Sequence, residues 1–456
     1  MRYWLETLGC PKNQVDSEKL AGMLEADGYQ AAPAPGEADL VVVNTCAFIE
    51  AARRESIDTV LELAGTRRPG AQLVVTGCMA ERYGSELAAA IPEVDRVAGF
   101  GVPVSFAAGA APVRTGVPVA LGAKRELDVP TFDLLNLPRR APTSPWAYVK
   151  VAEGCDRKCG FCAIPSFRGK QRSRQLEAVL AEVEALAVPE IVLVAQDLAS
   201  YGRDLGAKQI EALVAGVSAR VERTRLLYLY PSELTDGLID AVGATGCHYF
   251  DLSLQHVSRP HLRRMRRWGS GGRFAARIAD IRRRYPEAAF RSSFIVGYPG
   301  ETEEDHDLLL AFLQEVRLDW AGFFAYSAEE GTYAAGLDGA VDSTLVRERL
   351  AECSEIQDRI TASVRSALVG SRARVLVDSP GVARSHREAP EIDGIVTVPD
   401  TLPVGKFQDV EITGSDGPDL EAVPLGGPQA PPGGRPQGAE GVAGSWICDA
   451  PLAGAR

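Results

Sequence analysis

Three closely spaced cysteines are the residues of this chain most suited to chemistry. They lie in the stretch "EGCDRKCGFCAIP" with C-x3-C-x2-C spacing, at Cys155, Cys159 and Cys162. A core stripe on a helix has similar spacing, but the glycine and proline residues of this stretch disfavour a helix. Structural zinc usually takes two ligand pairs, and the sequence holds no further C-x2-C pair. A 4Fe-4S cluster normally takes four thiolates, so three thiolates would leave one iron open to another ligand.

A second set of three cysteines shares one position relative to predicted strands. Cys10 follows "WLETLG", Cys46 follows "LVVVNT" and Cys78 follows "LVVTG". In a parallel sheet the carboxyl ends of the strands lie at one edge, where ligands bind. A lone free cysteine is often a small buried hydrophobic residue. Three cysteines in the same position predict a second cluster with three protein ligands.

The elements that must position the second set form a βαβαβ pattern. Residues 1–110 alternate short apolar runs with helical periodicity, which predicts an α/β domain with a flavodoxin-like or Rossmann-like parallel sheet. Residues 111–145 are rich in Ala, Gly and Pro with poor periodicity, which indicates a linker.

The first set follows the opening strand of another series. Residues 146–369 carry "AYVKVA", "EIVLVAQD", "RLLYLYP", "YFDLSLQ" and "FRSSFIVGYPG", separated by helical patterns, which predicts a partial (βα) TIM-like barrel. Residues 370–424 hold short strands punctuated by Gly and Pro, which predicts a small antiparallel β-barrel. The Gly- and Pro-rich residues 425–456 predict a disordered tail.

The C-x3-C-x2-C loop after the first barrel strand resembles that of the radical S-adenosylmethionine (SAM) superfamily. That resemblance implies that SAM binds the open iron, and that one electron cleaves it to a 5'-deoxyadenosyl radical. It also implies that Gln196 and Asp197 in "AQDLASYG", and Ile295 and Gly297 in "FIVGYPGETEED", approach SAM. Both segments are equally compatible with ordinary strand-to-helix loops.

The two cysteine sets together resemble the methylthiotransferases over about residues 1–424. This resemblance implies two 4Fe-4S clusters, with the second cluster bearing the sulfur to be inserted, a C-terminal TRAM domain, and a second SAM as methyl donor. It further implies an electron donor such as flavodoxin or ferredoxin. In this reading Cys10, Cys46 and Cys78 are metal ligands, as are the catalytic Cys155, Cys159 and Cys162.

Three stretches indicate the subfamily. "TLGCPKNQVDSE", "EGCDRKCGFCAIPSFRG" and "EAPEIDG" resemble the pattern of RimO, which modifies the β-carbon of an aspartate in small-subunit ribosomal protein 12. The alternative is a transfer RNA enzyme that acts on N6-isopentenyl- or threonylcarbamoyl-adenosine. Those subfamilies tend to carry a Gln-Met-Asn run after the first cysteine.

Charge offers an independent argument about the partner. The net charge of −12 disfavours general nucleic-acid binding, and residues 370–424 hold ten Asp or Glu against five Lys or Arg. An acidic barrel suits a basic protein such as ribosomal protein 12, met free or on the ribosomal subunit. The run "HLRRMRRWG" at residues 261–269 predicts a solvated helix face, with phosphate contact as a secondary possibility.

The expected location of the protein in the cell rests on two sequence patterns that are absent. No apolar run approaches the roughly 20 residues of a membrane helix, and "MRYWLETLGC" has no secretory pattern. We therefore expect no membrane association and a cytoplasmic protein. The remaining cysteines, Cys247, Cys353 and Cys448, belong to no constellation, so we assign them to core packing or the tail.

Overall fold

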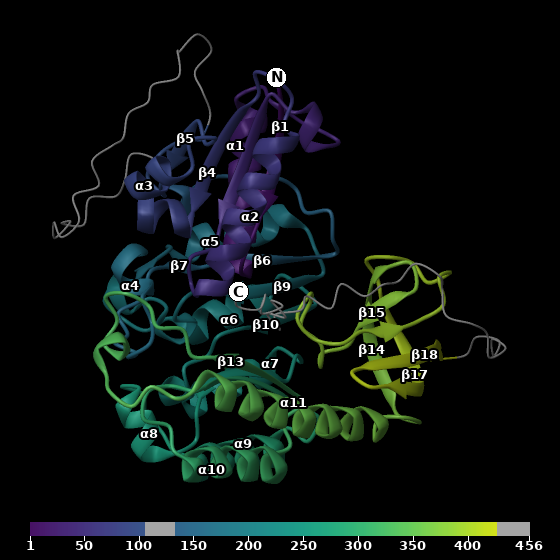
Figure 1. Cartoon of the computed structure of the whole chain (residues 1–456). Helices are drawn as coiled ribbons and strands as arrows, with labels where there is room; N and C mark the ends of the chain where they lie inside the picture. Colours follow the sequence, from purple (N-terminus) through teal and green to yellow (C-terminus); the bar gives the residue numbers. More distant parts are fainter. Residues whose placement is uncertain (105–132, 426–456) are drawn as a thin grey trace.

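The computed structural model describes residues 1–104 and 133–425. The expectations for most of the 111–145 linker and for the tail after residue 425 fall on 105–132 and 426–456, outside the described residues. A sheet domain lies beside a larger strand-and-helix body, and a small barrel is attached at the side of that body (Figure 1). The expected fold class is confirmed, and the elements below show how it positions the cysteines.

The N-terminal domain is a five-stranded parallel sheet in the order β2-β1-β3-β4-β5. Its strands are β1 (Arg2–Thr7), β2 (Gln30–Ala31), β3 (Leu40–Thr45), β4 (Gln72–Gly77) and β5 (Arg96–Ala98). Its helices are α1 (Pro11–Ala26), η1 (Pro35–Glu37), α2 (Glu50–Thr66) and α3 (Cys78–Ala90). Every residue of β3 is buried, as expected for a central parallel strand covered on both faces.

The central domain is an arc of parallel strands made of two three-stranded sheets, β6-β9-β10 and β11-β12-β13, which the bridge Leu229↔Leu252 joins. Its strands are β6 (Trp146–Lys150), β9 (Glu190–Val194), β10 (Arg223–Leu226), β11 (Tyr249–Gln255), β12 (Ala289–Val296) and β13 (Trp320–Ala325). Among the described residues β13 does not pair with β6, so the barrel is partial, as predicted.

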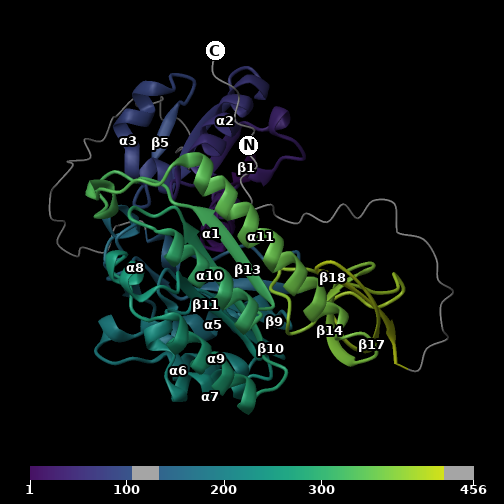
Figure 2. The same cartoon turned by 60° about the horizontal axis from the view of Figure 1, so that its bottom comes forward.

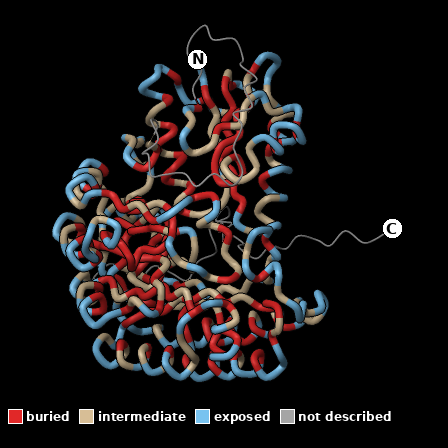
Figure 3. The backbone as a smooth tube through the Cα atoms, turned by 90° about the vertical axis from the view of Figure 1, so that its left-hand side faces the viewer, coloured by how far each residue is buried: buried red, intermediate tan, exposed pale blue. Residues whose placement is uncertain are grey.

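Helices cover the outside of this arc (Figure 2). They are α5 (Leu176–Leu186), α6 (Ile210–Ser218), α7 (Asp236–Ala244), α9 (Gly271–Arg284), α10 (Glu303–Val316) and α11 (Ser343–Ser366). Short elements fill the loops: η2 (Leu134–Asn136), β7 (Ala152–Glu153), α4 (Ile164–Phe167), β8 (Arg172–Ser173), η3 (Leu198–Ser200), η4 (Arg203–Leu205), η5 (Pro231–Glu233), α8 (Arg259–Arg264) and η6 (Ala334–Gly336). Buried backbone concentrates in the strands, and exposed backbone lies on the outer helices (Figure 3).

The C-terminal domain is a closed barrel in the order β14-β15-β16-β18-β17. Its strands are β14 (Arg372–Ser379), β15 (Val382–Arg384), β16 (Val396–Thr397), β17 (Phe407–Asp416) and β18 (Asp419–Pro424). The pairings are antiparallel, as predicted, except that β16 and β18 run parallel. Val375, Val377, Val410 and Ile412 lie in its core.

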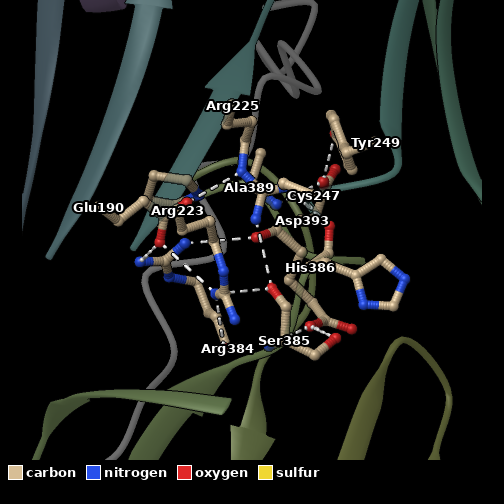
Figure 4. Close-up of polar contacts among 12 residues, drawn as sticks. Glu190, Arg223, Arg225, Cys247, Tyr249, Arg384, Ser385, His386, Ala389 and Asp393 are labelled. Atoms are coloured by element: carbon tan, nitrogen blue, oxygen red, sulfur yellow. Dashed lines mark hydrogen bonds and ion pairs between the residues drawn. The ribbon is translucent and has the colours of Figure 1, made fainter. Parts of the chain in front are cut away.

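A buried polar network fastens this barrel to the amino ends of the central strands (Figure 4). Glu190, at the start of β9, pairs with Arg225 at 3.0 Å and with Arg384 of β15 at 3.0 Å. Arg223 and Arg225 also donate to the single carbonyl oxygen of Ser385, at 3.1 and 3.2 Å respectively. Burial opposes ionisation of Glu190, but the surrounding arginines outweigh it and lower its pKa to about 2. Interdomain ion pairs therefore fix the position of the small barrel.

The segment "EAPEIDG" takes part in the same polar network. The Tyr249 hydroxyl donates to Asp393 at 2.6 Å, and the Ala389 amide donates to the same carboxylate at 2.9 Å. Glu388 is fully buried and forms an ion pair with Arg365 of α11. The segment thus closes the amino end of the partial barrel.

Candidate active site

The first cysteine set lies on the loop that follows β6 and β7. The Cys155 amide donates to the Gly169 carbonyl at 3.1 Å, and the Gly160 amide donates to the Met265 carbonyl at 2.8 Å. Gly154 has φ +76°, and a Cβ there would lie 2.1 Å from the Lys170 carbonyl oxygen. The loop is therefore held on both sides, and only glycine permits its entry into the turn.

Electrostatics show that these thiols are grouped. Burial, with a smaller contribution from Cys159, raises the pKa of Cys155 to about 11 and that of Cys162 to about 12, and Cys155 also contributes to the rise at Cys162. Cys159 has a cationic neighbour, because Nη1 of Arg267 lies 3.3 Å from its sulfur. Neighbouring thiolates repel one another, and the positive charge of a bound metal cluster would offset that repulsion. That these cysteines hold a cluster stays a prediction.

The second set converges at the predicted sheet edge. Cys10 is the N-cap of α1, Cys46 follows β3 directly, and Cys78 is the first residue of α3. The register aligns Thr7 with Asn44 and Thr45 with Gly77, so the three strands end side by side.

The thiols of this set also interact. Burial, together with the nearby Cys78 and Cys10, raises the pKa of Cys46 to about 12. Burial opposes ionisation of Cys10 as well, but the cations Lys12 and Arg168 outweigh it and lower its pKa. Cys10 is thus the thiol of this set that is most ready to act as a thiolate ligand.

Arg168 links the loop of the first set to Cys78 of the second set. It follows Cys162 on the barrel loop, yet its Nη2 lies 2.9 Å from the Cys78 sulfur and 2.8 Å from Asn13 Oδ1. Its Nη1 donates to Glu153 Oε1 at 2.8 Å, just before Cys155. The side chain is 1% exposed. The loops of the two cysteine sets therefore meet across the domain interface.

The segment Tyr228–Tyr230 forms a second link. The Nζ atom of Lys12, two residues after Cys10, lies 3.5 Å from the centre of the Tyr228 ring. The Tyr230 ring faces Arg157 at 4.1 Å and Arg267 at 4.0 Å, and both arginines contact cysteines of the first set. One short segment after β10 thus reaches from one set to the other.

Gln196 and Asp197 follow β9 and bond to residues that flank Cys155. Gln196 Nε2 donates to Glu153 at 2.9 Å, and Asp197 Oδ2 accepts from Arg157 Nε at 2.6 Å. The other oxygens, Gln196 Oε1 and Asp197 Oδ1, are buried without a hydrogen-bond partner. Buried acceptors are normally satisfied, so these two fit a ligand that donates hydrogen bonds, such as the ammonium group of SAM. Their role in binding stays a prediction.

Ile295 and Gly297 lie at the end of β12. Ile295 is half-buried against the barrel core, and Gly297 has φ +80°. A Cβ at Gly297 would lie 2.4 Å from Cγ2 of Val346 on α11. Backbone conformation and helix packing thus already require this glycine, and the contact of both residues with SAM stays a prediction.

The basic run at residues 261–269 is not a uniform solvated face, contrary to that expectation. Arg264 pairs with Asp338 at 2.8 Å, and Arg266 stacks 3.6 Å from the centre of the Tyr333 ring. Arg267 is buried against Cys159 and donates to the Ser253 carbonyl. Sequence reasoning missed Lys12, Arg168 and Arg267 as site residues, and only their closeness to the cysteine motifs could have indicated the first two.

A cavity of about 560 Å³ borders Cys10 between β1, α1 and the barrel. Tyr148, Glu391 and Ile392 also line it, whereas the first cysteine set does not. Within the described ranges, no group of three His, Cys, Asp or Glu side chains is arranged to hold a single metal ion. No helix in those ranges is long and apolar enough to cross a bilayer.

Three family matches divide the chain. Residues 2–99 match the uncharacterized protein family UPF0004, residues 149–313 the radical SAM superfamily, and residues 369–425 the TRAM domain. Together with the three-cysteine loop on a partial barrel, these matches define a radical SAM enzyme. Such an enzyme uses an iron–sulfur cluster and SAM.

Relatives specify the family further. The chain is 42% identical to the ribosomal protein uS12 methylthiotransferase RimO of Cutibacterium acnes, over 93% of this chain and 98% of the relative. It is 43% identical to the RimO of Moorella thermoacetica, over 89% of this chain and 95% of that protein. The chain therefore belongs to the RimO methylthiotransferase family, and the transfer RNA alternative is not favoured.

Solved structures show more distant likeness. The radical SAM methyltransferase TsrM of Kitasatospora setae, bound to tryptophan and a SAM analogue, aligns with a TM-score of 0.47 and 15% identity. That alignment covers 80% of this chain and 90% of TsrM.

Proposed function

We propose that this chain transfers a methylthio group to the β-carbon of an aspartate in ribosomal protein uS12, with 4Fe-4S clusters at both cysteine sets. The relatives that support the substrate carry uS12 in their names and align over nearly their whole length. The observation that carries the two-centre arrangement is Arg168, which bonds to Cys78 from the loop that holds Cys155, Cys159 and Cys162. Both sets border one interdomain region, so one substrate carbon could be served by both.

The reaction needs a cofactor because the β-carbon of aspartate is saturated and lacks an acidic proton for a side-chain base. When bound, the first cluster and SAM supply a radical that removes this hydrogen. The chain's residues bind and orient the groups: Cys155, Cys159 and Cys162 hold the first cluster, and Gln196, Asp197, Ile295 and Gly297 contact SAM. Cys10, Cys46 and Cys78 would hold the second cluster, which would supply the sulfur to be inserted.

Several further assignments complete the proposal. Flavodoxin or ferredoxin supplies the electron, and the protein works in the cytoplasm. We propose domain limits of 1–110, 146–369 and 370–424, with a linker at 111–145 and a tail at 425–456. The acidic C-terminal barrel orients basic uS12, free or on the ribosomal subunit, and contact with ribosomal RNA is secondary.

Mass spectrometry of ribosomal protein uS12 and of transfer RNA tests this function. Cells that lack the chain should lose the methylthio group on uS12 and keep their transfer RNA modifications. Restoring the intact chain should restore the group, whereas the Cys155→Ala variant should not. Loss of a methylthio group from transfer RNA with unchanged uS12 would overturn the proposal.

A further inference from the structure

Lys12 is a cation without an acidic partner at the edge of the second cysteine set. It lies in the first turn of α1, two residues after Cys10, and it is half-buried. Among the described residues, no carboxylate lies within ion-pair distance of its Nζ atom. The Nζ atom faces the Tyr228 ring, 3.5 Å from the ring centre, and its charge also interacts with the Cys10 thiol. An ammonium group shielded from water normally pairs with an anion.

The neighbouring cations differ from Lys12 because their charges are already matched. Lys150 pairs with Asp16 and with Glu153, the latter at 2.8 Å. Arg168 pairs with the same Glu153 at 2.8 Å. These cations belong to closed networks, so a new carboxylate would have to displace an existing one.

Two further cations in the region already have bonding partners. Arg291 pairs with Asp393 at 3.3 Å and with Asp251 at 3.6 Å, and Asp251 also accepts from the Tyr228 amide at 2.9 Å. Among the described residues Arg267 has no carboxylate partner, but its guanidinium bonds to the Ser253 carbonyl and lies against Cys159 in the first set. Of these cations, Lys12 alone combines a position beside Cys10 with a charge that no carboxylate of the described residues takes up.

The position of Lys12 relates it to both cysteine sets. Lys12 covers the ring of Tyr228, which lies at the carboxyl end of β10. Two residues later, Tyr230 faces Arg157 and Arg267. An anion held at Nζ would therefore lie between the sulfur-bearing set and the set that contains Cys155 and Cys159. That is where the carbon to be modified has to be placed.

We infer that Lys12 binds the side-chain carboxylate of the substrate aspartate and so selects aspartate over neutral side chains. The inference rests on the proposed function, because it takes aspartate as the substrate. The carboxylate is one bond from the β-carbon, so a cation that fixes it also fixes the distance of that carbon from the sulfur. Lys12 is thus a specificity-determining residue.

The test compares the reconstituted full-length enzyme with its Lys12→Met, Lys12→Arg and Lys406→Met variants. Methionine keeps the length of the side chain and removes its charge, and Lys406 is an exposed lysine of the small barrel that serves as a matched control. The substrate is intact uS12, and KM and kcat for methylthio transfer are measured separately. The same uS12 with Asp→Asn at the target serves as a competitor. Iron content and 5'-deoxyadenosine formation without uS12 are measured alongside.

Lys12→Met should raise KM for uS12 at least about thirtyfold, as expected when one partner of a shielded charge pair is lost. It should also remove the enzyme's preference for the aspartate protein over the asparagine competitor. Lys12→Arg should recover most of the affinity, and Lys406→Met should behave like the parent. Substrate-free SAM cleavage, which depends on the first cysteine set, should not change in any variant, and Lys12→Arg, which keeps the positive charge beside Cys10, should keep the iron content of the parent.

Two outcomes would overturn the inference while the proposed function stands: a Lys12→Met enzyme that still prefers aspartate, or one that loses iron in proportion to its activity. The second would mean that Lys12 only serves the cluster. A parent enzyme that cleaves SAM but leaves uS12 unmodified would instead refute the proposed function, and the inference with it.

Discussion

Arg168 connects two domains through one guanidinium. It bonds to Cys78 and Asn13 on one side and to Glu153 on the other, and its side chain is almost wholly buried. Burial opposes ionisation of Glu153, but Arg168 and Lys150 outweigh it and hold its pKa far below the usual range. A buried charge of this kind is costly to expose, so the pairing stabilises the docked arrangement only while it is complete.

Arg168→Met should therefore lower the free energy of unfolding by about 3–5 kcal/mol, because it leaves buried carboxylates short of a cation. Urea denaturation of the full chain measures the change. The control is Arg54→Met, whose exposed i,i+4 pair with Glu50 should cost less than about 1 kcal/mol. Equal effects of the two substitutions would show that Arg168 does not join the domains.

At this scale the sequence predicted the cysteines but not their partners. Cys155, Cys159 and Cys162 have a spacing that few structural roles require, and Cys10, Cys46 and Cys78 share a position after strands. A single Lys or Arg has no such pattern, because its partner is decided by docking between segments that are far apart in the sequence. Arg168 and Cys78 are 90 residues apart in the sequence and come together only in the folded chain.

Three histidines, of which two are buried and His386 is partly exposed, have lowered pKa values. Burial lowers the pKa of His256, just after β11, to about 3 and that of His261, in α8, to about 4. His386, in the segment that closes the amino end of the barrel, is lowered to about 4 by burial and by the neighbouring Arg387. In the unfolded chain these side chains titrate near 6.5.

Below pH about 6.5 the unfolded chain therefore binds protons that the folded chain does not. Stability should be fully present above that pH and fall as the pH drops toward 4, by up to about 1.4 kcal/mol per pH unit for each histidine. Denaturation at pH 7 and pH 5 measures this, and His256→Gln should reduce the slope. A parent and a variant with equal slopes would contradict the assignment of His256.

The elements themselves were largely predictable. Alternating apolar runs and helical periods indicated the parallel sheet and the partial barrel, since such patterns depend on local burial. The parallel pairing of β16 with β18 was not foreseen, because closing a barrel of short strands is decided by long-range register. The family resemblance implied that Gly297 approaches SAM, yet the close approach of α11 also explains why this position is a glycine.

In the whole molecule, the C-terminal barrel is docked by buried charge. Glu190 is fully buried among Arg223, Arg225 and Arg384. No sequence pattern indicates such a network, because its members come from β9, β10 and β15, which are far apart in the sequence. The network explains how an acidic barrel that suits a basic partner stays fixed relative to the cysteine loops.

Glu190→Gln should lower the free energy of unfolding by about 3–5 kcal/mol, since buried arginines lose their counter-ion. It should also make the segment between α11 and β14 more sensitive to proteolysis. Because the pKa of Glu190 is lowered to about 2, its contribution is present above pH about 4.5 and is lost as pH falls through about 2. Glu222→Gln is the matched control. It breaks an exposed pair with Arg374 between the same two domains and should cost less than about 1 kcal/mol. Comparable losses in both variants would contradict the docking role of Glu190.

The central claim is that one molecule holds two clusters, each on three cysteines. Anaerobic reconstitution followed by iron and sulfide analysis tests it most directly. The intact chain should bind about eight iron and eight sulfide, and replacing Cys10, Cys46 and Cys78 together by Ala should leave about four of each. About four iron in the intact chain, unchanged by that replacement, would contradict the second site and with it the account of sulfur transfer.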